Sequence, residues 1–184
     1  MNKRCEWANE EPTLSYHDNE WGRPEHDDGK LFEFLILEGA QAGLSWVTIL
    51  KRREGYRKAF ANFDAKKISK FNQNQISRLL KDESIIRNRL KINSAVNNAK
   101  KFLEVQDEFG TFDNYLWSFV DHKPIKNKFK KLADLPASTA ISEKMSKDLK
   151  KRGFNFVGPT ICYALMQAIG MVNDHTSSCF LHQK

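Results

Sequence analysis

Four residues near the two ends of the chain are of the types that bind zinc. Cys5 and His17 lie near the N-terminus, and His175 and Cys179 lie four positions apart near the C-terminus. Two thiolates and two imidazoles form a tetrahedral ligand set that zinc prefers. The spacing of twelve between Cys5 and His17 is not that of a zinc finger, so spacing alone leaves a shared ion open. A shared ion would join the two ends of the chain in a closed, structural site.

A second group of residues has the chemistry of a ligand pocket. Glu38 directly follows the apolar run Leu31–Leu37, where an unpaired carboxylate is costly. Such an acid either reaches solvent at a helix end or faces a pocket for a cationic or donor-rich ligand. Trp46 has small neighbours and could stack on a flat ring, although a single tryptophan is more often part of a core. Tyr16 would be held rigidly if the histidine beside it binds a metal.

The segment KKRGFNFVGPTICYALMQA, from Lys150 to Ala168, is typical of two helices joined by a short hairpin. We expect the first helix to end at Gly153 and the second to begin at Pro159, directly after Gly158. The free amides at the start of the second helix, around Thr160, would then bind a DNA phosphate at the positive end of the helix dipole. The turn would be anchored in the core by Phe154, Phe156 and Val157. An ordinary connection between helices fits the same glycines, and the preceding basic cluster favours DNA.

The other residues with metal-binding or reactive side chains are interpreted as structural. Asp18 either orients His17 as a hydrogen-bond acceptor or, with Asn19, caps a turn. Cys162 lies between apolar neighbours and is expected to be a buried thiol of the core. The histidines without a paired spacing, which we expect at the surface, are His26, His122 and His182.

Helix signals dominate the elements that must position these groups. The apolar run Leu31–Leu37 predicts a buried helix. A further helix is predicted from Ser142, a residue suited to the N-cap, and the last helix should run from Pro159 to Ala168. Apolar residues at helical period predict helices over Leu44–Phe60, Ile76–Leu80, Ile85–Leu103 and Phe112–Val120. Because strand alternation is scarce, the predicted fold class is all-α, with short loops and irregular termini.

Length and composition limit the class of protein. A chain of 184 residues with 40% hydrophobic and 29% charged residues fits one domain. No apolar run is long enough for a membrane span, and the start lacks the apolar segment of a secretory signal. Three cysteines do not favour a disulfide framework, so we expect a cytoplasmic protein. The net charge of +7 favours a polyanionic partner, although each short basic burst alone fits a solvated helix face.

Several long and unusual motifs occur in an order that can be compared with known families. They are Arg4-Cys5 with Trp7, YHDNEWG (Tyr16–Gly22), LEGAQAGLSW (Leu37–Trp46), KKRGFNFVGPTICY (Lys150–Tyr163) and VNDH followed by Cys179. From about Lys3 to Cys179 this pattern resembles the bacterial 3-methyladenine DNA glycosylase I family. The resemblance implies a helix–hairpin–helix DNA glycosylase fold. It also implies a single domain over residues 1–184, with two helical lobes and termini that form a zinc-bound part.

The resemblance also implies roles for the residues singled out above. The ligands of one structural Zn²⁺ would be Cys5, His17, His175 and Cys179. The pocket for a flipped base would be lined by Tyr16, Trp46 and Glu38, with Glu38 as the catalytic carboxylate. The residues expected to contact DNA are Gly43, Leu44, Gly153, Gly158 and Thr160, of which Gly43 and Leu44 would fill the gap left in the duplex.

The activity implied is hydrolysis of the N-glycosidic bond of 3-methyladenine in alkylated double-stranded DNA. A monomer would flip the base and leave an abasic site. Related glycosylases carry a catalytic aspartate near the position of Asp174, but in this family the neighbouring His175 binds zinc, so we assign Asp174 no catalytic role.

Two other functions remain open at this point. One is a zinc-stabilised DNA-binding module without enzymatic activity, which would have no use for a buried pocket around Glu38. The other is a metallohydrolase, which needs an open coordination position, whereas four protein ligands leave none.

Overall fold

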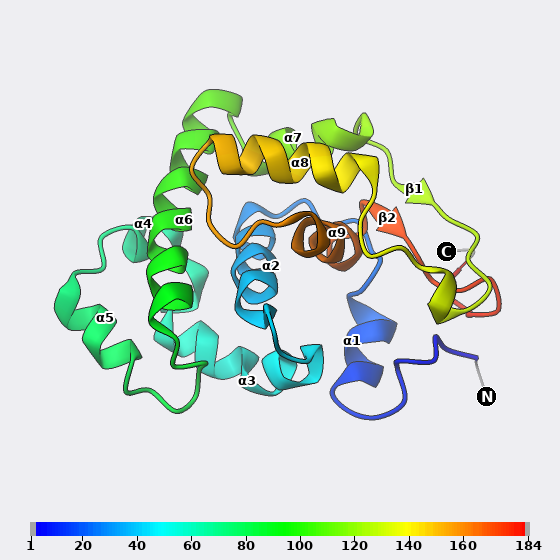
Figure 1. Cartoon of the computed structure of the whole chain (residues 1–184), viewed down its shortest axis with the longest axis horizontal. Coiled ribbons are helices and arrows are strands. Elements are labelled where there is room, and N and C mark those ends of the chain that lie inside the picture. Colours follow the sequence, from blue (N-terminus) through cyan, green and yellow to red (C-terminus); the bar gives the residue numbers. More distant parts are fainter. Residues whose placement is uncertain (1–2, 183–184) are drawn as a thin grey trace.

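The computed structural model describes residues 3–182, and helices form most of it (Figure 1). The α-helices are α1 (Thr13–Asn19), α2 (Asp28–Gln41), α3 (Trp46–Ala59), α4 (Ala65–Ile68), α5 (Gln73–Leu79), α6 (Arg89–Phe109), α7 (Phe112–Trp117), α8 (Ala140–Lys151) and α9 (Pro159–Ala168). Three short 3₁₀ helices are η1 (Ala61–Phe63), η2 (Ser118–Val120) and η3 (Leu132–Asp134). The strands β1 (Ile125–Lys126) and β2 (Val172–Asn173) pair in parallel. This agrees with the predicted helical fold class.

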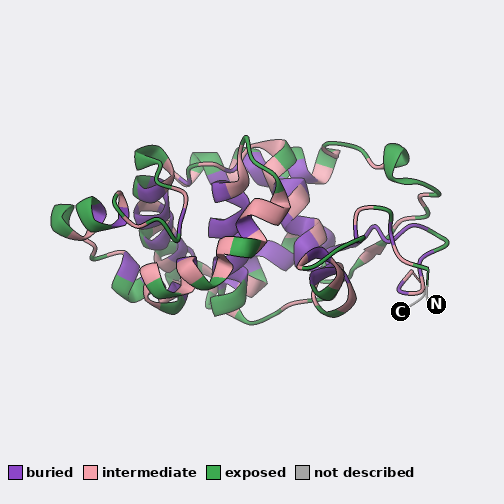
Figure 2. Ribbon diagram, turned by 90° about the horizontal axis from the view of Figure 1, so that it is seen from below, coloured by how far each residue is buried: buried purple, intermediate pink, exposed green. Residues whose placement is uncertain are grey.

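The centre of the molecule is built on α2. Every residue of α2 from Leu31 to Ala40 is buried, so the predicted buried helix is confirmed. The helix begins at the N-cap Asp27, whose carboxylate accepts from the backbone N–H of Lys30. It contacts α3, α6, α7 and α9, which surround it. Figure 2 shows the buried residues gathered in the middle of an elongated molecule. Because α2 is enclosed by these helices, a polar group on its buried part must be satisfied by the protein or by a ligand.

The two ends of the chain lie at the same end of the molecule. Figure 1 shows the N- and C-termini beside α1, β1 and β2, while α4 and α5 form the opposite end. The parallel pairing of Ile125 with Val172 and of Lys126 with Asn173 holds the segment after η2 against the segment after α9. Chain segments that are far apart in the sequence therefore meet at this end.

Two predicted helix starts are wrong. Ser142 is not an N-cap, because the helix begins earlier, after Thr139. The Thr139 hydroxyl accepts from the backbone N–H of Ser142, and the backbone N–H of Thr139 donates to the Ser142 hydroxyl, which makes a capping box. The helix predicted from Ile85 begins at Arg89, because Asn88 caps it. In both cases a residue other than the expected one supplies the cap.

The other predicted helices are confirmed, with small shifts at their ends. The predicted last helix coincides with α9, from Pro159 to Ala168. The helix expected from Leu44 begins at Trp46, after the cap Ser45. The four-residue α4 and the seven-residue α1 were not predicted, since so few residues carry little periodic signal.

No helix in the part of the chain that the structure describes combines the length and the apolar character that a membrane span requires.

Candidate functional site

A cavity of about 280 Å³ opens between α1, α2, α3 and α9. Its polar wall is formed by Glu38 and Gln41 of α2 and Gln167 of α9. The aromatic wall comprises Trp7, Tyr16, Trp21 and Trp46, and Leu132 and Leu135 border it from the segment around η3. The volume lies just below the usual range for ligand pockets, which runs from about 300 to 1,000 Å³. The three predicted pocket residues thus face one cavity.

Glu38 is buried in this cavity and unpaired. The residue is 3% exposed, and its Oε2 has no hydrogen-bond partner among the described residues. Burial raises the pKa of Glu38 to about 8. The alternative of a glutamate that reaches solvent is therefore wrong. A buried acceptor without a partner is costly, and a ligand that donates a hydrogen bond would remove that cost.

The aromatic wall places flat rings beside this carboxylate. The rings of Tyr16 and Trp46 lie with centroids 5.5 Å apart at 55°, and Tyr16 also contacts Phe34 of α2. Burial, with the nearby charge of Glu38 as a second cause, raises the pKa of Tyr16 well above its usual value, so its hydroxyl keeps its proton. Trp46 Nε1 is buried without a hydrogen-bond partner among residues 3–182. The pocket therefore offers a flat ligand aromatic faces, one orphaned acceptor and one orphaned donor.

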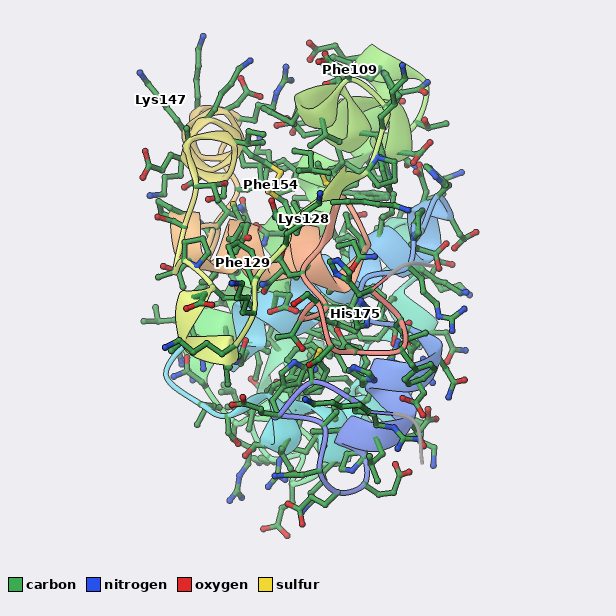
Figure 3. The ribbon with its side chains drawn as sticks, turned by 90° about the vertical axis from the view of Figure 1, so that its right-hand side faces the viewer. Phe109, Lys128, Phe129, Lys147, Phe154 and His175 are labelled. Atoms are coloured by element: carbon green, nitrogen blue, oxygen red, sulfur yellow. The ribbon has the colours of Figure 1, made fainter. Side chains whose placement is uncertain are left out.

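At the end of the molecule that carries the termini, three of the four predicted metal ligands come together. The ligand atoms of Cys5, His17 and Cys179 lie within 4.8 Å of one another, and all three residues are buried. Cys179 Sγ is 3.4 Å from His17 Nε2. His175 falls outside this compact group, but its ring packs edge-on to that of His17, with centroids 4.9 Å apart. Figure 3 shows this end of the molecule facing the viewer, with His175 labelled.

Both histidines are held by a hydrogen bond at Nδ1. The Nδ1–H of His17 donates to Asp18 Oδ1 at 2.8 Å, and the Nδ1–H of His175 donates to Asn173 Oδ1 at 2.9 Å. His17 Nε2 accepts from the backbone N–H of Cys5 at 3.4 Å, whereas His175 Nε2 is buried without a partner among residues 3–182. Burial lowers the pKa of both rings, that of His175 to about 4, which favours the neutral form that binds metals. The prediction that Asp18 orients His17 is confirmed.

The donor set fits zinc better than a hard cation, because it consists of sulfur and imidazole nitrogen. Burial raises the pKa of the Cys5 thiol to about 11, so a bound cation would have to displace that proton. The orphaned Nε2 of His175 is a further donor atom suited to such a cation. The prediction that His182 is a simple surface residue is wrong, since it is half-buried and its Nδ1–H donates to the carbonyl of His175 at 2.9 Å.

The hairpin between α8 and α9 has the predicted outline. Gly153 takes a positive φ of 90°. Gly158 precedes α9 without a side-chain cap, and a Cβ added at Gly158 would have no atom within 4 Å. The amides at the start of α9 are thus free of a side-chain cap, and Thr160 is exposed. Phe154 and Val157 are buried as predicted, whereas Phe156, which takes a positive φ of 54°, is only half-buried.

Two polar residues of α6 hold the neighbouring loops, and neither was predicted from the sequence. Asn98 is buried, and its amide donates to the carbonyl of Asn155 and accepts from its N–H, at 2.9 and 2.8 Å. Lys91 Nζ donates to the carbonyls of Ala40 and Ala42, at 2.8 and 2.7 Å, at the C-terminal end of α2. The sequence signal for Asn98 is an asparagine on the apolar face of a long amphipathic helix. Asparagine is unfavourable there unless its side chain has a hydrogen-bond partner.

The loop between α2 and α3 is open to solvent. Gly43 has a positive φ of 76°, with nothing within 4 Å of the position that a Cβ would take, and Leu44 is 39% exposed. The two hydrogen bonds from Lys91 fix the start of this loop, while its tip is open.

Asp174 is buried, and both of its carboxylate oxygens accept hydrogen bonds from other side chains of the protein. Its Oδ2 accepts from the hydroxyl of Tyr163 at 2.5 Å and from Nε2 of Gln167 at 2.8 Å, while Oδ1 accepts from Nδ2 of Asn127 at 2.7 Å. These bonds tie α9 to the segment that follows β1. Both oxygens of this carboxylate therefore accept hydrogen bonds from the protein itself.

Comparison with known proteins gives consistent similarities. A family model described as methyladenine glycosylase matches residues 7–182. The chain is 48% identical over 178 residues to DNA-3-methyladenine glycosylase 1 of Escherichia coli (strain K12), covering 96% of this chain and 95% of that protein. A crystal structure of a 3-methyladenine DNA glycosylase I is similar with a TM-score of 0.94 at 48% identity, covering 98% of this chain and 100% of that one. The Staphylococcus aureus 3-methyladenine DNA glycosylase I, solved to explain 3-methyladenine recognition, has a TM-score of 0.93 at 35% identity and covers 96% and 95%.

Proposed function

The chain belongs to the methyladenine glycosylase family, and from this premise we propose that it removes 3-methyladenine from alkylated DNA. The reaction is hydrolysis of the N-glycosidic bond, and it leaves an abasic site as the first step of base-excision repair. The observation that carries the proposal is the unpaired carboxylate of Glu38 in an aromatic cavity. A DNA-binding module without activity would not need this costly group.

The chemistry of the lesion explains why one carboxylate is sufficient. Methylation at N3 places positive charge on the purine, so the base is already a good leaving group. The glycosidic bond is inaccessible inside a duplex, so the base must first leave the stack, at a cost of a few kcal/mol. Tyr16 and Trp46 would receive it by stacking, which contributes about 1–3 kcal/mol per base.

Glu38 would accept a hydrogen bond from the exocyclic amine of the extruded base and stabilise its charge. Neutral adenine gains less from a carboxylate, so the pocket selects the cationic lesion. As the bond breaks, positive charge moves from the base to the sugar. The contact therefore contributes more to lesion binding than to lowering the barrier, and the lability of the lesion itself supplies most of the rate.

The DNA would be held by the two open loops that flank the pocket. The free amides at the start of α9, together with Gly153, Gly158 and Thr160, suit a phosphate. Leu44, at the tip of the loop after α2, suits the gap that the flipped base leaves, with Gly43 allowing a close approach. Such contacts position the duplex without reading its sequence.

We propose that Cys5, His17, His175 and Cys179 hold one structural Zn²⁺. The compact cluster and the orphaned His175 Nε2 support this, and the ion would clasp the two ends of the chain. Four protein ligands would leave no open position, so the zinc would take no part in the reaction. The buried free thiols agree with a reducing cytoplasm.

The direct test is incubation of the protein with a duplex treated with a methylating agent, followed by chromatographic identification of the released bases. We expect free 3-methyladenine in preference to 7-methylguanine and normal adenine. Binding of the duplex without release of any base would support the DNA-binding module instead. Size-exclusion chromatography of the same sample should give a monomer, as expected for a single domain of 184 residues.

Lys91→Met should weaken excision without weakening recognition of the base. Loss of the hydrogen bonds to Ala40 and Ala42 loosens the loop that carries Leu44, and a small misplacement costs about 10-fold in kcat/KM on methylated duplex. Binding of free 3-methyladenine, followed by tryptophan fluorescence, should stay at the wild-type level. Lys100→Met, at an exposed lysine of the same helix, is the matched control. Equal losses in both assays would contradict this role.

Asp174→Asn should lower stability and spare activity. The carboxylate accepts three hydrogen bonds, so we expect the free energy of unfolding to fall by about 1–3 kcal/mol in urea titrations. At a temperature where the variant is folded, release of 3-methyladenine should remain within a few-fold of wild type. A large drop in kcat at unchanged stability would instead make Asp174 catalytic.

A further inference from the structure

Three lysines point outward from one extended segment beside the termini. From Ile125 to Lys130 the residues alternate between half-buried and exposed, as in a strand with one face on the protein. The exposed positions are Lys126, Lys128 and Lys130, and we call these three side chains the lysine row. Figure 3 shows Lys128 on this face beside Phe129. The strand itself covers only Ile125–Lys126 and Lys130 lies in a bend, so at about 6.6 Å between alternate residues the row extends over at most roughly 13 Å.

The backbone beneath the lysine row is fixed to the rest of the fold. The N–H groups of Ile125 and Asn127 donate to the carbonyls of Met171 and Asn173 at 2.9 and 3.1 Å, and the carbonyl of Phe129 accepts from Ser177 at 2.8 Å. The Asn127 side chain donates to the buried Asp174. Because the backbone is already ordered, binding to the row orders only the lysine side chains within the protein.

The charges of the lysine row are not neutralised within the protein. None of its three ammonium groups forms an ion pair with a residue in the range 3–182, whereas Lys30, Lys67 and Lys101 each pair with an acid. The nearby carboxylate of Asp134 is engaged by the backbone N–H groups of Lys130 and Lys131, at 3.2 Å each. A row of unpaired positive charges on a fixed backbone suits a regularly spaced polyanion.

The lysine row is continuous with the rim of the pocket. The chain passes from Lys130 through η3 to Leu135, and both Leu132 and Leu135 border the cavity that holds Glu38. Across the cavity, Gln41 lies just before the open loop with Leu44. DNA that delivers a base into this cavity must pass over its rim, so its backbone is the polyanion nearest to the row.

We propose that Lys126, Lys128 and Lys130 form a second contact with the DNA backbone, beside the pocket and separate from the hairpin. It binds phosphates flanking the flipped nucleotide over roughly four nucleotides, since one strand carries a charge about every 3.4 Å along the axis. The contact is independent of sequence, and its contribution falls as salt rises. This inference rests on the proposed function, because it takes alkylated duplex as the substrate.

The test compares two triple variants that lose the same charge. One is K126Q/K128Q/K130Q, and the control is K66Q/K70Q/K81Q, at exposed lysines around α4 and α5, at the far end of the molecule. Fluorescence anisotropy gives the affinity for a duplex with a tetrahydrofuran abasic-site analogue between 50 and 300 mM NaCl. Each lost phosphate contact should reduce the slope of log K against log [salt] by about 0.9, so the row variant should lose about 2.7.

At 100 mM NaCl the row variant should bind at least about 10-fold more weakly than wild type, while the control keeps the wild-type slope. At saturating methylated duplex the control variant should release 3-methyladenine at the wild-type rate, since it alters neither the pocket nor a proposed DNA contact. An unchanged slope in the row variant, or equal changes in both variants, overturns the proposal. Then an acidic protein partner or plain solvation explains the lysines.

The two proposals fail in different ways. If wild type releases no 3-methyladenine but the row variant still loses salt dependence, the proposed activity is wrong and the lysine row still binds DNA. If base release is normal and the slope does not change, the activity stands and the row is not a DNA contact. Thermal melting of both triple variants should match wild type, because all six lysines are exposed.

Discussion

Glu38→Gln is expected to lower kcat/KM for release of 3-methyladenine by about 10- to 100-fold, the effect of losing a charge-assisted hydrogen bond of about 1.5–3 kcal/mol. The amide has nearly the shape of the acid but carries no charge for the cationic base. Affinity for a duplex with an abasic-site analogue should change little, because the hairpin and the open loops remain. Base release assayed over a range of substrate concentrations, together with anisotropy, separates the two effects.

The pH dependence of kcat/KM tests whether the charge of Glu38 causes this loss. Because burial raises the pKa of Glu38 to about 8, the carboxyl of the free protein is protonated below that pH and cannot pair with the cationic base. For wild type, kcat/KM should therefore rise about 10-fold per pH unit up to about pH 8 and then level off. Glu38→Gln should lack this rise, and Glu10→Gln, at an exposed glutamate, should keep it.

The free energy of unfolding of wild type should change with pH in the direction opposite to kcat/KM. The pKa of Glu38 is higher in the folded state than its ordinary value of 4.5, so ionisation costs wild type stability as pH rises from 4.5 to about 8. At pH 9 the Glu38→Gln variant should thus unfold with a free energy higher by about 1–3 kcal/mol, and below pH 4.5 the difference should vanish. Equal loss of duplex binding and base release, with no gain in stability, would refute the role of the carboxylate.

Cys179→Ser is expected to remove the zinc and to lower the melting temperature by about 10 °C or more. Loss of one thiolate opens the clasp between the chain ends, and structural zinc sites contribute directly to folding free energy. Metal content by mass spectrometry should fall from one zinc per chain to nearly none. Below its melting temperature, the variant should still release 3-methyladenine, because the proposed site uses no metal chemistry.

A buried thiol outside the cluster provides the control for this variant. Cys162 lies on α9, and its Sγ donates to the carbonyl of Val157 at 3.4 Å. Cys162→Ala should keep one zinc per chain and lose only the packing of a sulfur atom. If Cys179→Ser keeps its stability but loses turnover, the ion is catalytic and the proposal of a structural site is wrong.

Much of the candidate site could be predicted from the sequence. Long motifs indicated the family, and single residue types indicated the zinc ligands and the acid of the pocket. Glu38, Tyr16 and Trp46 do face one cavity, and Cys5, His17 and Cys179 do cluster. The roles of Lys91, Asn98 and the lysine row could not be predicted in the same way. A surface lysine and a loop-clamping lysine have the same side chain, so only their surroundings distinguish them.

The local elements of this protein follow from its amino-acid sequence alone. The buried run of α2, the bounds of α9 and the Gly153 turn arise from an apolar run, proline geometry and glycine freedom, all of which act between near neighbours. Tertiary contacts set the rest: Glu38 is enclosed without a partner, and Lys91 reaches across from α6 to the end of α2. These outcomes depend on long-range packing, which sets burial and hydrogen-bond partners between residues that the chain brings together only when it folds.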